Sequence, residues 1–145
     1  MRGITIALLV LLVAQFWLGM SINLEVSLPV MHLGAIGSLV YYGGHFRFVL
    51  AHIVNGSAIL ALSLALLGSA LKTRSAALKA SSAITVASVT GAITNGVLFL
   101  MSGQFFGFSI GMAMSAVSVL LSCAAILYYV GLHMGLAEPN IGQGN

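Results

Sequence analysis

Four long apolar stretches limit this chain to a membrane environment. They cover about residues 4–26, 48–71, 80–101 and 108–131, and each reaches the roughly 20 residues that a helix needs to cross the hydrocarbon core. Lipid offers no hydrogen bonds to the backbone, so a spanning segment must pair its own N–H and C=O groups, as a helix does. We therefore expect an all-α fold, an integral membrane up-down four-helix bundle.

The scarcity of charge supports the same conclusion. Of 145 residues, only 5 are Lys or Arg and 2 are Asp or Glu, whereas about a quarter of the residues in a soluble domain are charged. A surface with so few charges must face lipid, and we expect the bilayer to be the main partner. The few basic residues behind the net charge of +3 do not form the basic patch that nucleic-acid binding requires, so no nucleic-acid partner is expected.

The longest break between spans contains a candidate interfacial element. Pro29 and the glycine-rich segment 34–44 end the first span and leave a loop over 27–47. Tyrosine and aliphatic residues lie among these glycines, and Tyr is favoured at the membrane interface. We predict a short lid element on the outer side. The tail 136–145 has no structure-forming pattern and is expected to be disordered or extended, so that residues 1–145 form a single transmembrane domain.

The basic residues predict an orientation. With four spans, four of the five fall on one side: Arg2, Lys72, Arg74 and Lys79. Only Arg47 falls on the other side. Because cytoplasmic loops carry an excess of Lys and Arg, we expect a multi-pass protein of the cell membrane with both termini in the cytoplasm and the loops 27–47 and 102–107 outside.

Polar and sulfur-bearing side chains gather in the outer third of the spans. His52 and Asn55 lie one to two turns deep in the second span and, three residues apart, share a helix face. Asn95 lies about two turns below the outer end of the third span, and two methionines lie at a similar depth in the fourth. Gln15 is assigned to the inner half. Intramembrane polar groups usually mark functional sites, so we place the candidate site in the outer third.

This group of side chains is suitable for binding a haem. A flat macrocycle needs a ligating imidazole and a residue without bulk beside it, and His52 with Gly56 supplies both. Haem iron can be held by a His/Met pair. We predict haem b with His52 and Met114 as iron ligands, Met114 being preferred to Met112. The candidate cofactor-binding residues are His52, Met114, Met112, Asn55, Gly56, Asn95 and His45. The alternative interpretation is interhelical hydrogen bonding by the asparagines and methionines that fill the core.

The segments His52 to Leu67 and Ser109 to Leu121 resemble one half of the haem A synthase family, whose members are built from four-helix haem-binding modules. The similarity covers about half of the chain. The family's acidic residue, three positions before its histidine, falls on Val49, its second ligand histidine falls near Met114, and its outer-loop cysteine pair has no counterpart. The resemblance implies a haem-binding module without the reactive carboxylate and thiols. Residues 18–29 also resemble small four-span membrane proteins of unassigned function.

The sequence is consistent with three functions. The first is a haem b-binding, cytochrome-like electron-transfer subunit of a respiratory chain, acting near the outer face. The second is a cofactor-free accessory subunit of a larger respiratory membrane complex, or a homo-oligomer, in contact through the small-residue stripe Gly103, Gly107 and Gly111. The third is a haem-modifying enzyme related to haem A synthase. An enzyme is not favoured, because the sequence offers no Ser-His-Asp set and no paired carboxylates.

Overall fold

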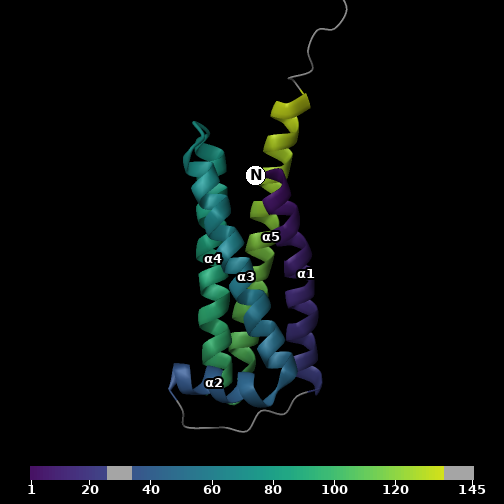
Figure 1. Cartoon of the computed structure of the whole chain (residues 1–145), viewed down its shortest axis with the longest axis vertical. Helices are drawn as coiled ribbons and strands as arrows, with labels where there is room; N and C mark the ends of the chain where they lie inside the picture. The colour runs from purple at the N-terminus through teal and green to yellow at the C-terminus, as the bar shows by residue number, and fades with distance from the viewer. Residues whose placement is uncertain (26–33, 136–145) are drawn as a thin grey trace, which may run out of the picture.

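The computed structural model of the chain describes residues 1–25 and 34–135. Within these ranges the chain forms five helices and no strand, in the order α1 (Arg2–Glu25), α2 (Ala35–His45), α3 (Arg47–Leu71), α4 (Ala76–Met101) and α5 (Phe106–Gly135) (Figure 1). The predicted break at Pro29 and the predicted unstructured tail 136–145 lie outside the described residues.

The four long helices confirm the predicted all-α membrane bundle. Each of α1, α3, α4 and α5 is long and apolar enough to cross a membrane, and their bounds match the four predicted spans closely. The polar hairpin between α3 and α4 ends where Ser75 caps α4, because its hydroxyl oxygen accepts a hydrogen bond from the Leu78 N–H at 3.3 Å. Such a cap satisfies a backbone donor that the first helical turn leaves without a partner.

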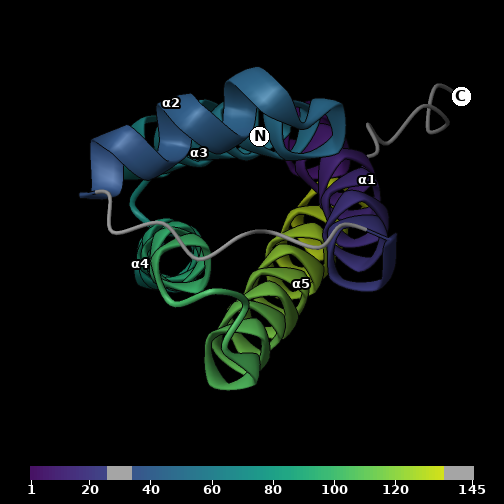
Figure 2. The ribbon, with the colours of Figure 1, turned by 90° about the horizontal axis from the view of Figure 1, so that it is seen from below.

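The helices run alternately up and down around a square. In the described part of the chain, α1 lies beside α3 and α5, and α4 lies beside the same two helices (Figure 2). Both views show that α5 is tilted: it lies closest to α1 at the end away from α2 and diverges from it toward α2, where Asn23 of α1 still donates to Ser109 of α5 at 3.0 Å (Figures 1 and 2). The tilt leaves the bundle wider at the α2 end.

The short helix α2 is the predicted lid element. It lies across one end of the bundle and contacts α3 and α4 (Figures 1 and 2). Its anchor is Tyr42, which is fully buried in a cluster with Ile22, Val49, Phe99 and Leu100. An aromatic side chain of this size fixes α2 against the ends of the long helices.

A second buried cluster fills the opposite part of the bundle. Its members come from all four long helices and include Leu8, Leu66, Val89, Val119 and Ile126. Packing of this kind holds membrane helices together, because lipid supplies no hydrophobic driving force between them. Between the two clusters lies the interior that carries the candidate site.

Candidate functional site

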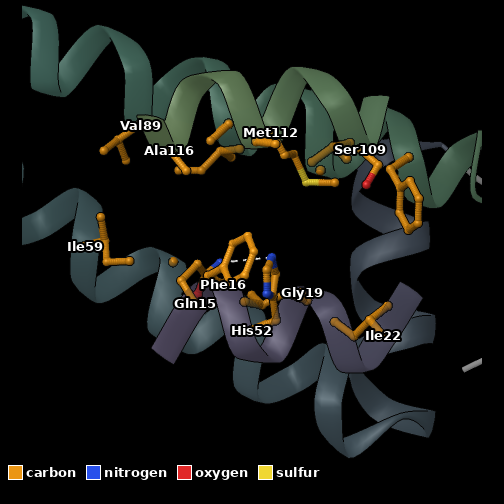
Figure 3. A pocket seen from close by; sticks show the side chains of 18 of the residues that line it. Gln15, Phe16, Gly19, Ile22, His52, Ile59, Val89, Ser109, Met112 and Ala116 are labelled. Atoms are coloured by element: carbon orange, nitrogen blue, oxygen red, sulfur yellow. Dashed lines mark hydrogen bonds between the residues drawn. The ribbon is translucent and has the colours of Figure 1, made fainter. Parts of the chain in front are cut away.

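A cavity of about 360 Å³ lies between the two clusters, lined by the four long helices and by Leu39 of α2 (Figure 3). The volume falls at the lower end of the range for ligand pockets. The lining is almost wholly apolar, and no described lining residue carries a formal charge. The polar side chains on its wall are Gln15, Asn23, His52, Ser57 and Ser109.

His52 stands on the α1–α3 side of this cavity, opposite α5 (Figure 3). Two glycines make the close approach of α1 and α3 possible. A Cβ at Gly19 would come 3.4 Å from His52 Cε1, and a Cβ at Gly56 would come 3.3 Å from Gln15 Nε2. Each glycine thus leaves room for a polar side chain of the other helix, as small residues do at helix contacts in membranes.

A row of hydrogen bonds links α1 and α3 at this point. Asn55 Nδ2 donates to the Leu11 carbonyl at 2.9 Å and to Gln15 Oε1 at 2.7 Å. The other end of the Gln15 amide lies 2.9 Å from His52 Nε2, which is the ring nitrogen on the side toward α5 in Figure 3. His52 Nδ1 is buried and has no hydrogen-bond partner among the described residues. Asn55 therefore does not line the cavity, and it contributes to the site through its hydrogen bond to Gln15.

The methionine facing His52 is Met112. Its side chain lines the cavity, and its sulfur lies 3.5 Å from the position of a Cβ on Gly96 of α4. Figure 3 shows Met112 pointing from α5 into the space in front of His52. Met114, the preferred ligand from the sequence, is 64% exposed on the outer surface of α5 and is absent from the described lining. The physical reason is that two residues turn a helix by about 200°.

Two other predicted site residues lie away from the cavity. Asn95 packs between α4 and α5: its Nδ2 donates to the Gly91 carbonyl at 2.8 Å, and its amide fills the space beside Gly111. His45 lies exposed at the end of α2, where its Nδ1 donates to the Tyr41 carbonyl at 2.8 Å and its ring stacks on Tyr41 at 4.4 Å. Neither belongs to the described lining.

The three glycines of the predicted stripe have different surroundings in the structure. Gly103 lies in the α4–α5 turn with φ 67°, a conformation that favours glycine. Gly107 lies under the Phe105 ring, and Gly111 receives Asn95 of α4. Of the three, Gly111 is the one that receives a side chain of another helix, and Gly107 is exposed. Contact with a partner through these glycines stays a prediction.

Sequence reasoning missed Gln15 and Gly19. The sequence predicts Gln15 in the inner half, apart from the site, whereas its amide is hydrogen-bonded to His52 Nε2. The spacing held a usable signal, because Gln15 and Gly19 are one helical turn apart on α1, as His52 and Gly56 are on α3. When two helices each carry a polar residue followed four positions later by glycine, the polar residue of each helix can pack against the glycine of the other.

The fold and the site together define a multi-pass membrane helical bundle with a single polar row beside an apolar cavity. Comparison with protein-family models, with curated proteins and with solved structures finds no match for this chain.

Proposed function

We propose that the chain is a haem b-binding membrane protein in which His52 Nε2 and the Met112 sulfur hold the iron. The observation that carries the proposal is that these two side chains, from α3 and α5, line one cavity and face each other across it (Figure 3). His/Met ligation is one of the established ways to hold haem iron in proteins. Facing helices of a bundle are the usual source of such ligands.

Three features of the site fit a haem. The apolar walls suit the faces of a porphyrin, and the glycines beside the polar row, Gly19 and Gly56, leave little bulk around His52. The buried, unpartnered Nδ1 of His52 can carry the ring proton and so leave Nε2 to ligate. Asn23 Nδ2 donates to Ser109 Oγ at 3.0 Å, and this pair would offer polar contacts to the propionates of a haem.

A haem bound here would supply one-electron transfer, and His52, Met112 and the apolar wall of the cavity would hold it. The low polarity of the cavity wall would affect the redox potential of the iron through the local dielectric. The distribution of basic residues supports an outer position for the site: Lys72, Arg74 and Arg2 lie at the end away from α2, and Arg47 begins α3 beside α2. By the positive-inside rule, we propose that the termini are cytoplasmic, that the membrane is the cell membrane, and that α2 faces outward.

An absorption spectrum of the purified full chain, expressed with a haem supply, tests the proposal. We expect a Soret band that His52→Ala abolishes and that Met112→Ala shifts or weakens. Met114→Ala is the matched control, since it makes the same change two residues away on the outer surface of α5. A colourless, folded preparation, or equal effects of the two methionine variants, would overturn the proposed ligation.

A further inference from the structure

The carbonyl of Leu11 sets the direction of the whole hydrogen-bond row. A carbonyl oxygen can only accept, so the Asn55 atom 2.9 Å from it must be the amide nitrogen. The same nitrogen lies 2.7 Å from the Gln15 side chain, and the Gln15 atom that receives its second hydrogen must be oxygen. The end of Gln15 that faces His52 is therefore the NH₂ group. This assignment follows from the chemistry of the partners alone.

The direction of the row determines where His52 carries its proton. An amide NH₂ donates, so His52 Nε2, 2.9 Å away, must accept with its lone pair. A proton on Nε2 would place two donors against each other. A neutral imidazole with an accepting Nε2 has its proton on Nδ1, which is the buried atom without a described partner. We propose that Gln15 and Asn55 are positioning residues that hold His52 as the neutral Nδ1–H tautomer, with the Nε2 lone pair on the side of the cavity.

This arrangement prepares a ligand without using a charge. Ligating histidines usually owe their tautomer to a carboxylate or carbonyl bonded to the other ring nitrogen, and a carboxylate is costly inside a membrane. Here two neutral amides and a backbone carbonyl act on Nε2 itself. The Nε2 lone pair that accepts the hydrogen bond from Gln15 is the same lone pair that would ligate a metal. Ligation therefore requires the Gln15 amide to turn away from Nε2. The tautomer of His52 is a property of the protein without haem, so it goes beyond the proposed haem binding.

Nitrogen NMR of the full chain in detergent micelles, labelled with ¹⁵N-histidine and without added haem, tests the inference. Protonated and unprotonated ring nitrogens have well-separated shifts, and His52→Gln assigns the signals. We expect His52 Nδ1 to be protonated and Nε2 to be unprotonated, with the Nε2–H tautomer below about one tenth. Loss of two interhelical hydrogen bonds biases such an equilibrium by about tenfold.

Two variants separate positioning from mere packing. Gln15→Glu keeps the shape but presents an acceptor to His52, so it should move a proton onto Nε2. Asn55→Leu frees Gln15 to invert and should give a mixture of tautomers, with about a tenfold rise in the ratio of the Nε2–H to the Nδ1–H form. Asn95→Leu, outside the row, is the control and should leave the His52 signals unchanged. Should Gln15→Glu fail to fold, the wild-type spectrum and Asn55→Leu still decide the matter.

The outcomes are separable from those of the proposed function. A protonated Nε2 in the wild type, or a Gln15→Glu protein with unchanged His52 signals, would overturn the positioning role and leave haem binding to the absorption spectrum. A colourless protein with the expected tautomer would overturn the proposed haem binding. Gln15 and Asn55 would remain the residues that determine the tautomer of His52.

Discussion

Adding one methyl group at Gly111 should destabilise the bundle measurably. An ideal Cβ there would lie 2.5 Å from Asn95 Oδ1, 2.7 Å from Cγ and 3.0 Å from Nδ2. The Asn95 amide cannot move freely, because it is bonded to the Gly91 carbonyl at 2.8 Å. Overpacking of this kind costs about 1–3 kcal/mol. Replacing a mid-helix glycine by alanine returns about 0.5–1 kcal/mol, so Gly111→Ala should lose up to about 2.5 kcal/mol.

The free energy of unfolding of Gly111→Ala can be measured by titrating SDS into detergent micelles and following helix content. Gly68→Ala is the matched control, since a Cβ there meets nothing within 4 Å, and it should be as stable as the wild type or more stable. The difference between the two variants isolates the packing cost of about 1–3 kcal/mol.

A double-mutant cycle identifies the clash partner. Asn95→Ala removes the amide that the new methyl group would meet, so Gly111→Ala should cost nothing in that background. The coupling energy between the two positions should therefore equal the packing cost, within the 0.5–3 kcal/mol usual for residues in contact. Equal stabilities of Gly111→Ala and Gly68→Ala, or a coupling energy near zero, would refute the reasoning.

Three further results are expected. Gly19→Leu should weaken or abolish a His52-dependent Soret band, because even its Cβ would lie 3.4 Å from the His52 ring, whereas Gly3→Leu, with nothing within 4 Å, should not; equal spectra would contradict the site geometry. Cys123 is fully buried, so a maleimide should label it only after denaturation, as mass spectrometry of the folded and unfolded chain would show. Ser82→Ala should not lower the free energy of unfolding, since its buried hydroxyl has no described partner; a loss above about 1 kcal/mol in SDS titration would reveal one.

The sequence predicted the architecture well because a few strong constraints determine it. The lengths of the apolar stretches and the need for internal backbone pairing in lipid fixed the four spans, and the glycine- and tyrosine-rich loop predicted α2. These signals act locally along the chain and need no knowledge of neighbours.

The candidate site was only partly predictable, because it depends on how the helices are rotated about their axes. A depth estimate brought His52 and the methionines to one level but favoured Met114, whereas Met112 is the methionine that lines the cavity and Met114 points outward. It also kept Gln15 apart from His52, since depth counted from a guessed boundary ignores the tilt and offset of α1 and α3. Rotation and offset arise from packing between helices, and single residues such as Gly19 reveal them only in three dimensions.

The tilt of α5 gives the bundle a different interior at each end. Where α5 lies close to α1, buried side chains from all four long helices pack around Leu8, Val119 and Ile126. Where α5 diverges from α1, the cavity occupies the interior. Because Val119 belongs both to the buried cluster and to the cavity wall, the packing of the bundle and the shape of the cavity depend on each other.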